Sequence, residues 1–541
     1  MEYLVTGEMA RLIDRFTIDQ TGVPSLILME RASLAVAVQV EKLAVSLEHA
    51  GEQRILSVCG SGNNGGDGMA AARILWCRGY DVSILLVGNP LKLSEDAGVQ
   101  LRIARNMGVP VIEADQLKGF EDSELDEDIC EEFLSSYDIL LDAIFGTGLS
   151  REVGGSYLTW IRAINRRGEA GASICAVDIA SGVDSDEGRI LGEAVRADVT
   201  VTFGYRKSGM ILFPGAVYSG KVVCEEIGFD PRAMDQFEQK TICYDSEDLA
   251  LMPARQPDSN KGTYGKVLVI AGSRNMAGAA AFSAKAAYYA GAGLVTVLTP
   301  ECNRVIIQTL VPEAVLKTYP EEGADTDQLL ELVRSHTVTI LGPGLGTETA
   351  SVHIVQEVLG CLSDQPLILD ADALNILSEH RDWLKKAGTA SRGRIIITPH
   401  IKELSRLTGD NIQTLKTNMN HICGDFSRSY GVICIAKDAR TRVYTDCGPE
   451  CEPVSAAGSL SEPIYINVSG NHGMSTGGAG DVLTGVIGGL CAQGLDPAQA
   501  SRLGVYIHGL AGDRALEKHG AYAVTATAIL DGLSGIFAGK Q

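Results

Sequence analysis

The sequence predicts an α/β fold of two domains, each a parallel β-sheet between two layers of helices. The chain has 541 residues, and a single hydrophobic core rarely grows beyond roughly 250–300 residues. Short apolar runs alternate with helical patterns along most of the length, which is typical of parallel sheets covered on both faces. A polar segment without long periodicity separates two such series. We therefore place domains at residues 1–234 and 260–541, joined by a linker region at residues 235–259.

The amino-acid composition indicates which classes of protein this chain can belong to. Hydrophobic residues make up 45% of the chain and charged residues 21%, which is ordinary for a globular protein. The net charge of −22 argues against a nucleic-acid partner or an anionic membrane surface. No run reads as a signal peptide or a membrane span. The 13 scattered cysteines are typical of reduced thiols, so we expect a cytoplasmic protein whose partners are small molecules.

The elements of the first half are one early helix and a series of buried strands. Met9, Leu12, Ile13 and Phe16 recur at helical spacing and predict an amphipathic helix. Five strands are expected after it: "RILSVC" (Arg54–Cys59), "DVSILLVG" (Asp81–Gly88), "DILLDAIFG" (Asp138–Gly146), "ASICAVDIA" (Ala172–Ala180) and "DVTVTFG" (Asp198–Gly204). Their apolar, β-branched character is that of central strands in a parallel sheet.

The second half repeats this alternation with different sequences. Six strands are expected there: "KVLVIAGS" (Lys266–Ser273), "LVTVLTP" (Leu294–Pro300), "VTILGPG" (Val338–Gly344), "PLILDADA" (Pro366–Ala373), "RIIITPH" (Arg394–His400) and "GVICIAK" (Gly431–Lys437). Helical patterns lie between them, so we expect a second parallel sheet with helices on both faces.

Three unusual loops follow strands of the first half. They are "GSGNNGGDG" (Gly60–Gly68), "DAIFGTGLSRE" (Asp142–Glu152) and "VDIASG" (Val177–Gly182), and a helix is expected to begin near Met69 after the first. Any one of them could be only a tight connection. Ligands of open parallel sheets bind beyond the carboxyl ends of the strands, where all three loops would lie. Together they predict a binding site.

Backbone amides in these loops could bind an anion. Glycines that open a helix leave N–H groups uncovered, and the positive end of the helix dipole adds to their field. The candidate amides are those of Gly65, Gly66, Gly146 and Gly148. The first loop has neither the G-x-G-x-x-G spacing of a dinucleotide fingerprint nor the Lys-Ser/Thr of a P-loop, so it predicts neither site.

Polar side chains of the same loops suggest a cation site and proton transfer. Asn64, Asp142 and Ser181 offer hard oxygen ligands, which suit alkali and alkaline-earth cations better than soft metals. Asp67 and Asp178 are candidate proton carriers.

These three blocks resemble the NAD(P)H-hydrate epimerase family, over most of residues 1–230. The resemblance implies a Rossmann-like sheet, hydrated NADH or NADPH as substrate, and a potassium ion held by Asn64, Asp142 and Ser181. It implies that the substrate is bound by Asn63, Asn64, Gly65, Gly66, Asp67, Gly146, Thr147, Gly148, Leu149, Ser150, Arg151, Glu152 and Asp178, with Asp178 as the base. This chain departs from the family pattern at Ala180, where the family usually has proline.

The second half carries the stretch "NVSGNHGMSTGGAGDVLTGVIGG" (Asn467–Gly489). Its glycines precede an apolar helical run, so the amides of Gly478, Ala479 and Gly480 would form an anion site. Asp481 lies among these donors, where a carboxylate is expected to accept a proton. Sugar kinases have such an aspartate beside the hydroxyl that attacks ATP, so this stretch predicts phosphoryl transfer.

Five other blocks of the second half lie at strand ends or between strands. They are "NKGTYGKVLVIAGS" (Asn260–Ser273), "GPGLG" (Gly342–Gly346), "DADALN" (Asp370–Asn375), "TPHIKEL" (Thr398–Leu404) and "KDARTRV" (Lys437–Val443). An isolated histidine is more often structural. His400, however, follows Thr-Pro at a strand end and precedes a helix, so we expect it to bind a ligand.

As a set, the motifs of the second half resemble the ADP-dependent NAD(P)H-hydrate dehydratases of ribokinase-like fold, over roughly residues 250–538. The resemblance implies that Ala279, Ala280, Gly344, His400 and Asp481 contact the hydrate. It implies that the nucleotide is bound by Lys437, Asp438, Ala439, Arg440, Thr441 and Gly480, with ADP as phosphoryl donor together with Mg²⁺. Asp438 departs from the family pattern, which usually has glycine there.

The two resemblances imply a repair enzyme for hydrated NADH and NADPH. Hydration gives two epimers, of which a dehydratase repairs the S form, and an epimerase on the same chain makes the R form available. Asp481 would take the hydroxyl proton while the oxygen attacks ADP, and the ring nitrogen would then expel phosphate. A vitamin-precursor kinase fused to a non-catalytic ligand-binding domain is the alternative, and a non-enzymatic regulatory module is a third possibility. We also expect a homo-oligomer.

Overall fold

The fold is described from a computed structural model, which covers residues 1–47, 53–117, 126–362, 364–447 and 462–537. The chain divides into two compact units. The first, or N-terminal, unit is Tyr3–Phe237, and the second, or C-terminal, unit comprises Met1–Glu2 and Glu238–Gln541.

The N-terminal unit is built on one parallel sheet. Its strands, in spatial order, are β4 (Val111–Glu113), β3 (Asp81–Leu86), β2 (Arg54–Cys59), β5 (Ile139–Ala143), β6 (Ser173–Val177), β7 (Val199–Phe203) and β9 (Lys221–Glu225). All neighbouring pairs are parallel, as predicted. The sequence did not predict β4 and β9. Both lie at the edges of the sheet, where partly exposed residues leave no continuous apolar run.

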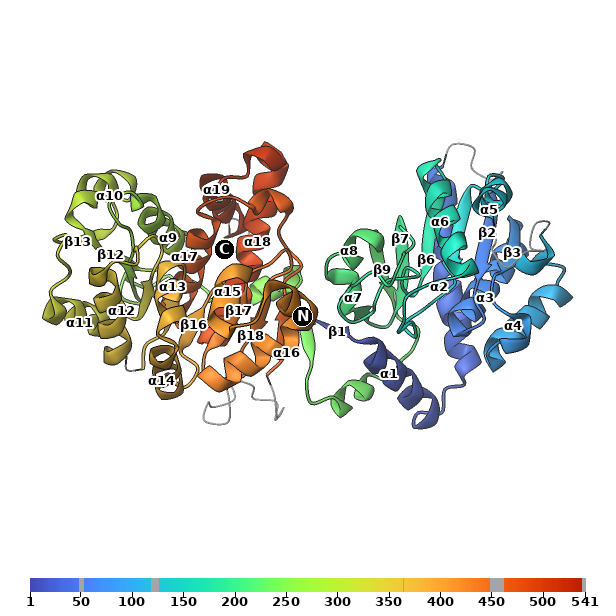
Figure 1. The fold of residues 1–541 in the computed structure, drawn as a ribbon, viewed down its shortest axis with the longest axis horizontal. Coiled ribbons are helices and arrows are strands. Elements are labelled where there is room, and N and C mark those ends of the chain that lie inside the picture. Colours follow the sequence, from blue (N-terminus) through green and yellow to red (C-terminus); the bar gives the residue numbers. More distant parts are fainter. Residues whose placement is uncertain (48–52, 118–125, 363, 448–461, 538–541) are drawn as a thin grey trace. The chain divides into compact units, whose positions relative to one another are not determined.

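Helices cover both faces of this sheet (Figure 1). One layer contains α2 (Ser25–Ser46), α3 (Asn63–Cys77) and α4 (Glu95–Asn106), and the other contains α5 (Glu127–Leu134) and α6 (Ser156–Glu169). Alternate residues of β2 point into the two cores: Ile55 and Cys59 pack with the first layer, and Leu56 and Val58 with the second. This is the predicted three-layer arrangement.

A short pair of parallel strands joins residues near the N-terminus to residues late in this unit. Strand β1 (Glu2–Val5) pairs with β8 (Arg206–Lys207), with Val5 opposite Lys207. Helix α1 (Gly7–Asp19) follows β1 and is the predicted amphipathic helix, with Ile13 fully buried. The remaining helices of the unit are α7 (Ser208–Ile211), α8 (Gly215–Tyr218) and the 3₁₀ turns η1 (Pro90–Lys92), η2 (Ala114–Gln116) and η3 (Pro231–Gln236).

The C-terminal unit contains a longer sheet. Its spatial order is β13 (Val315–Tyr319), β12 (Leu294–Pro300), β11 (Lys266–Ile270), β14 (Val338–Leu341), β15 (Leu367–Leu369), β16 (Ile395–Ile397), β17 (Ile433–Ala436), β18 (Arg442–Tyr444), β19 (Ile464–Ile466) and β10 (Thr241–Cys243). The strands from β13 to β17 are parallel, as predicted. Strand β18 is antiparallel to both of its neighbours.

Two helical layers also enclose this sheet (Figure 1). On one face lie α11 (Thr326–Ser335), α12 (Thr349–Cys361), α13 (Asp372–Glu379), α14 (Arg381–Ser391), α15 (Ile401–Thr408) and α16 (Ile412–Tyr430). The other face contacts α9 (Ala277–Tyr289), α17 (Ala479–Ala492) and α18 (Pro497–His519). Helices α10 (Arg304–Leu310) and α19 (Ala526–Phe537) and the 3₁₀ turns η4 (Ser246–Leu251), η5 (Glu301–Asn303), η6 (His472–Met474) and η7 (Ala521–Ala523) complete the unit.

The predicted linker region, residues 235–259, contains regular structure. Strand β10 lies within it and pairs in parallel with β19, with Ile242 opposite Tyr465. Ile242 and Cys243 are buried, so this segment contributes to the second sheet. A three-residue strand that begins with the polar Thr241 gives too short an apolar run for the sequence to reveal it.

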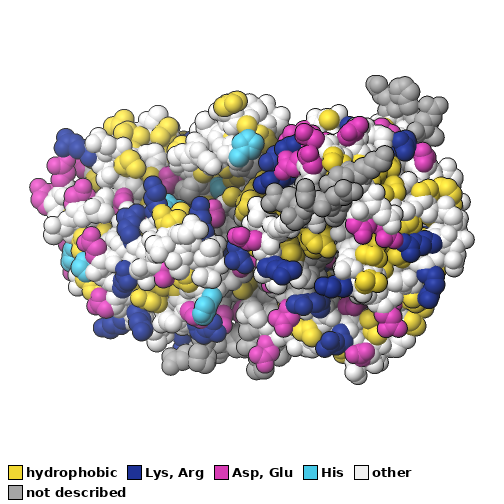
Figure 2. Space-filling model, turned by 45° about the vertical axis from the view of Figure 1, so that its right-hand side comes forward, with side chains coloured by type: hydrophobic (Ala, Val, Ile, Leu, Met, Phe, Trp, Pro, Cys, Tyr) yellow, Lys and Arg dark blue, Asp and Glu magenta, His cyan; other side chains and the backbone are white. Residues whose placement is uncertain are grey.

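Acidic and basic side chains are interspersed on the face drawn in Figure 2. None of the helices in the described ranges combines the length and apolar character needed to cross a bilayer. The cysteines of these ranges are all free thiols.

Candidate active sites

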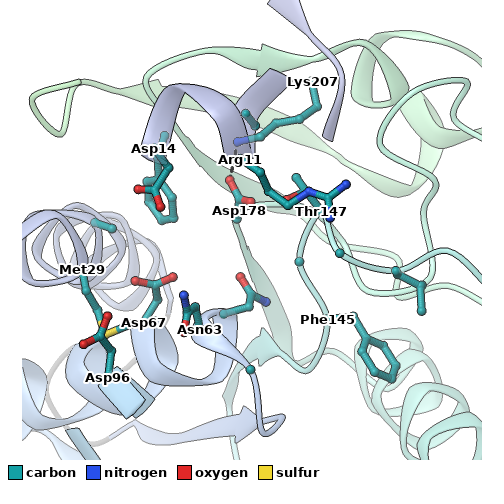
Figure 3. Close-up of a pocket in the computed structure, with 18 of the residues that line it drawn as sticks. Arg11, Asp14, Met29, Asn63, Asp67, Asp96, Phe145, Thr147, Asp178 and Lys207 are labelled. Atoms are coloured by element: carbon teal, nitrogen blue, oxygen red, sulfur yellow. Dashed lines mark hydrogen bonds and ion pairs between the residues drawn. The ribbon is translucent and has the colours of Figure 1, made fainter. Parts of the chain in front are cut away.

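The first candidate site lies at the switch point of the N-terminal sheet. Strand order reverses between β2 and β5, and ligands of such sheets bind beyond the carboxyl ends of the strands at this point. The loops after β2, β5 and β6 meet there around a cavity of about 560 Å³ (Figure 3). The predicted substrate residues that line it are Asn63, Asn64, Asp67, Gly146, Thr147, Gly148, Leu149, Ser150, Arg151 and Asp178. Gly65, Gly66 and Glu152 are not among its lining residues.

Helix α3 begins at Asn63, well before the predicted start near Met69. The first turn of α3 was not predicted from the sequence, because it is rich in glycine, which has a low helix propensity. The prediction that Gly66 offers a free amide is therefore wrong: its N–H donates to the Gly62 carbonyl at 3.1 Å. Gly66 instead allows close packing, since a Cβ there would lie 2.8 Å from the Met29 Cε.

Asp142 and Ser181 form a buried polar pair behind this cavity. The Ser181 hydroxyl donates to one Asp142 oxygen at 2.6 Å, and the Ser181 amide donates to the other at 2.7 Å. Both side chains are fully buried. Burial raises the pKa of Asp142 to about 6, although these hydrogen bonds oppose the shift.

Asn64 has an unusual environment for a buried amide. Its Nδ2 and Oδ1 atoms have no hydrogen-bond partner among the described residues. A Cβ at Gly146 would approach the same Oδ1 at 3.3 Å, so Asn64 lies directly against the second loop. An unpaired buried amide costs free energy unless a ligand satisfies it.

Asp178 occupies the end of β6 in a left-handed conformation, with φ of 64°. Few non-glycine residues adopt this conformation, and such strain is concentrated at functional sites. One carboxylate oxygen, Oδ1, accepts hydrogen bonds from Lys207 Nζ and, at 3.3 Å, from Thr202 Oγ1. Lys207 Nζ also donates to Thr202 Oγ1 at 2.7 Å.

Three further carboxyl groups face the same cavity. Asp14, Asp67 and Asp96 lie opposite Asp178 in Figure 3. Burial, and then the charge of Asp178, raise the pKa of Asp67 well above its usual value. Burial and the charge of Asp96 raise the pKa of Asp14. Burial and like charge therefore favour the protonated forms of Asp67 and Asp14 in this cluster.

Sequence reasoning missed several residues of this cavity. Arg11 and Asp14 come from α1, Asp96 from α4, and Lys207 from β8. None lies in a glycine-rich loop or beside another predicted site residue. Only Lys207 carried a signal, because it comes shortly after the predicted strand Asp198–Gly204.

The second candidate site is centred on the start of α17. Gly478 has φ of 89° and caps the helix, and Asp481 lies in its first turn. The Asp481 carbonyl accepts hydrogen bonds from Ser283 Oγ at 3.1 Å and Thr484 Oγ1 at 2.8 Å. The predicted stretch therefore forms a helix N-terminus whose first amides have no partner within the helix, and the Asp481 backbone is fixed there.

Asp370 and Lys437 form an ion pair beside this helix start. Lys437 Nζ donates to Asp370 Oδ1 at 2.7 Å, and Thr398 Oγ1 donates to the same oxygen at 2.7 Å. A Cβ at Gly480 would lie 3.3 Å from Lys437 Nζ, so this glycine admits the ammonium group to the α17 terminus. Burial lowers the pKa of Lys437, but Asp370 and Glu403 raise it more.

The environment of Asp481 favours proton transfer near neutral pH. Burial, followed by the charge of Asp370, raises its pKa to about 7, while Lys437 opposes the shift. A general base works best when its pKa lies close to the working pH. Asp370 was not predicted as a contact residue, although the block "DADALN" that begins with it was among the predicted motifs of this site.

His400 caps α15 with its imidazole ring. Nδ1 accepts hydrogen bonds from the amides of Lys402 at 3.1 Å and Glu403 at 3.3 Å, and the His400 amide donates to Glu403 Oε2 at 2.8 Å. Burial, and then Lys437, lower the pKa of His400. The neutral ring therefore carries its proton on Nε2, which lies 3.3 Å from Glu403 Oε1. Lys437 is adjacent through a parallel bridge.

The other predicted residues of the second site lie around this centre. A Cβ at Gly344 would lie 3.0 Å from that of Ala279, so these two residues are neighbours. Ala280 is fully buried. Asp438, Ala439, Arg440 and Thr441 form the turn between β17 and β18, where Asp438 Oδ1 accepts from the Ala439 amide at 2.8 Å.

His508 on α18 was not predicted. Its Nε2 is buried without a hydrogen-bond partner among the described residues. Burial lowers the pKa of His508 to about 4, and the ring bonds to the backbone of Ala479 at the start of α17. The His508 ring therefore supports the N-terminus of α17 through this contact with Ala479.

Comparison with known proteins gives the family of both units. Residues 25–209 match the profile of the YjeF-related protein N-terminus, and residues 267–534 match that of NAD(P)H-hydrate dehydratase. The bifunctional NAD(P)H-hydrate repair enzyme of Thermofilum pendens is 36% identical over 527 residues, covering 96% of this chain and 93% of that protein. The enzyme of the same name from Moorella thermoacetica is 35% identical over 538 residues, covering 98% of this chain and 95% of that protein.

A solved structure is similar to part of this chain. The ADP/ATP-dependent NAD(P)H-hydrate dehydratase of Bacillus subtilis, co-crystallised with ATP and Mg²⁺, is 27% identical and covers 54% of this chain and 96% of its own, with a TM-score of 0.44. The full-length relatives share both units in one polypeptide. This chain therefore belongs to the family of bifunctional NAD(P)H-hydrate repair enzymes.

Proposed function

We propose that the first site epimerises the R and S hydrates of NADH and NADPH, and that the second dehydrates the S hydrate at the expense of ADP. The assignment rests above all on Asp481, a carboxyl group with a pKa of about 7 at a helix N-terminus beside Lys437. The two activities correspond to residues 1–234 and 260–541, with residues 235–259 between them.

In the second site, the hydroxyl of the hydrate lies on the carbon beside the ring nitrogen. Asp481 takes the hydroxyl proton, and the oxygen attacks the terminal phosphoryl group of ADP. The amides of Gly478, Ala479 and Gly480 and the ammonium group of Lys437 stabilise the charge on that group. The nitrogen lone pair then expels phosphate, which leaves far more easily than hydroxide. The resulting iminium ion loses a proton from the neighbouring ring carbon, which restores the ring double bond, so the products are AMP, phosphate, a proton and the reduced nicotinamide.

The remaining contacts of the second site are part of the same proposal. His400 would donate its Nε2–H to the hydrate, which would also contact Gly344, Ala279 and Ala280. The turn from Lys437 to Thr441 and Gly480 would contact the nucleotide, and Mg²⁺ would neutralise negative charge on the phosphates during the transfer. Asp438 places a carboxylate in this turn, which we expect to weaken nucleotide affinity compared with glycine.

In the first site, Asp178 is the base that removes the hydroxyl proton of the hydrate. Substrate contacts come from Asn63 to Asp67 and Gly146 to Glu152. Asn64, Asp142 and Ser181 fit a potassium ion, because the unpaired Asn64 amide and the buried Asp142–Ser181 pair supply one charge and neutral oxygens. Such an ion would fix the loops after β2, β5 and β6 against one another.

Two broader properties belong to the same proposal. The free thiols of the described residues suit a cytoplasmic location. We also propose a homo-oligomer that handles only small-molecule partners.

One incubation tests the function. A mixture of hydrate epimers is supplied with ADP and Mg²⁺, and phosphorus NMR is recorded together with reduced-nicotinamide absorbance. We expect one AMP and one free phosphate for each nicotinamide restored. A persistent phosphoester on the acceptor, without free phosphate, would favour the vitamin-precursor kinase. ATP in a parallel sample shows which nucleotide is preferred.

The potassium site has its own test. Ion content is measured for the wild type and Asp142→Ala after dialysis into potassium-free buffer and re-addition of potassium, and epimerase rates are recorded alongside. We expect bound potassium and epimerase activity to fall together in the variant. Equal ion content in the two proteins would contradict the assignment.

A further inference from the structure

Lys207 is a buried lysine at the wall of the first site. Its side chain is 3% exposed, and the side chain of its partner Asp178 is 16% exposed. Lysine is rarely buried unless it is paired. The backbone of Lys207 is fixed because β8 pairs with β1, where it lies opposite Val5. Both its main chain and its ammonium group therefore have defined positions.

The hydrogen bonds of Asp178 are asymmetric. Lys207 Nζ and Thr202 Oγ1 both bind Oδ1, and Oδ2 has no hydrogen bond among the described residues. Thr202 is fully buried and also accepts from Lys207 at 2.7 Å. One oxygen is thus anchored, and the other remains available on the cavity side. Figure 3 shows Lys207 reaching Asp178 from the side away from Asp67.

The charges that face Asp178 come from several elements. Helix α1 contributes Arg11 and Asp14, α3 contributes Asp67, and α4 contributes Asp96. Arg151 lines the cavity from the loop after β5 but is exposed. Among the described residues that line the cavity, Lys207 is the cation bonded to Asp178. Removing its charge would leave Asp178 facing mainly other carboxyl groups.

We propose that Lys207 is a positioning residue for epimerisation: its ammonium group anchors Oδ1 of Asp178 and so directs the free Oδ2 toward the substrate hydroxyl. Thr202 completes this arrangement by holding Lys207 Nζ and Asp178 Oδ1 in one geometry. The inference rests on the proposed role of Asp178 as the base. It adds a residue that the family resemblance did not include.

The test uses the full chain, so that dehydratase activity reports correct folding. Lys207→Met keeps the volume of the side chain without its charge, and Lys207→Arg keeps the charge. We expect Lys207→Met to lose roughly 10²-fold or more in epimerase kcat, in the range typical of disabled proton transfer. Lys207→Arg should retain more activity. Exposed Lys221→Met is the matched control and should behave as wild type.

Two readouts separate positioning from a purely structural role. The acidic limb of the epimerase pH profile should move to higher pH in Lys207→Met, because the base loses its cationic partner. Ethylammonium should restore part of the activity of Lys207→Ala, since it can return a positive charge to the vacated space. A structural lysine would give neither effect.

The possible results separate a wrong assignment of Asp178 as the base from a wrong role for Lys207. An active Asp178→Asn variant would overturn the proposed function of the site itself. If Asp178→Asn is inactive while Lys207→Met has normal kcat and an unshifted pH limb, only the present inference is wrong. If the Lys207 variants do not fold, Thr202→Val decides: a lowered kcat with a shifted limb supports the inference, and wild-type behaviour contradicts it.

Discussion

Asp481 is held at a pKa of about 7 by burial and by the nearby Asp370 carboxylate. A base must be ionised to act, so activity requires the deprotonated form. We predict that kcat/KM for dehydration falls about tenfold per pH unit below pH 7 and levels off above it. Asp481→Asn should lose this activity by roughly 10³-fold or more while epimerisation is unchanged. A pH series with both assays checks this, with exposed Asp531→Asn as control.

Functional side chains such as Asp481 are predictable from sequence where they lie in a recognisable backbone motif. Asp481, His400 and Asp178 all follow strand ends or glycine-rich turns, whose chemistry is legible from a few adjacent residues. Lys207, Asp14 and Asp370 contribute through contacts between distant segments. Charge and burial at such positions depend on packing that no local pattern contains.

At the scale of one helix, α15 combines a structural and a binding function in its capping residue. His400 Nδ1 satisfies the first amides, and Nε2 remains as a donor. We predict that His400→Asn keeps the free energy of unfolding within ~0.5 kcal/mol of wild type, because asparagine is a good N-cap. Dehydratase kcat/KM should still fall by about 10²-fold through loss of the donor. Chemical denaturation and steady-state kinetics measure the two effects separately.

Asn411→Ala provides the matched control, because Asn411 caps α16 by accepting from the Thr414 amide at 2.9 Å. That variant should lose about 1 kcal/mol of stability and retain its kinetics. If His400→Asn keeps both stability and kcat/KM, the ring has no role beyond capping.

Helices α17 and α9 pack closely because glycines of one face alanines of the other. A Cβ at Gly485 would lie 2.3 Å from the Ser283 carbonyl oxygen and 2.5 Å from the Ala286 Cβ. Alanine gains up to about 1 kcal/mol in helix propensity, but overpacking costs typically 1–3 kcal/mol. We therefore predict that Gly485→Ala lowers the melting temperature and dehydratase activity.

Gly360 offers a control within the same unit. It lies in α12 with nothing within 4 Å of the position of an added Cβ. Gly360→Ala should raise stability by a few tenths of a kcal/mol to about 1 kcal/mol, without changing activity. If Gly485→Ala were equally stabilising, close packing would not be the reason for the glycine.

Central strands were predictable because each is a continuous apolar run buried on both faces. Strands β4, β9 and β13 lie at sheet edges. Strands β10 and β18 are short and each includes a polar residue, Thr241 and Arg442, so their apolar patterns are weak. The start of α3 was misplaced for another reason. Its first turn is rich in glycine, and the capping geometry and close packing outweigh propensity there.

At the scale of the whole molecule, two sites on one chain divide a repair that neither completes alone. We predict that Asp178→Asn restores only the S fraction of a mixed hydrate sample, since the R epimer is no longer converted. Asp481→Asn should interconvert the epimers and restore none. The hydrates are small solutes that exchange with solvent, so an equimolar mixture of the two variants should restore the whole sample. Chiral chromatography of the hydrates, with nicotinamide absorbance, follows all three reactions.

Each variant alone at doubled concentration is the control. If the mixture stops at the S fraction, the hydrate does not pass through solvent, and the two sites must exchange it within one chain.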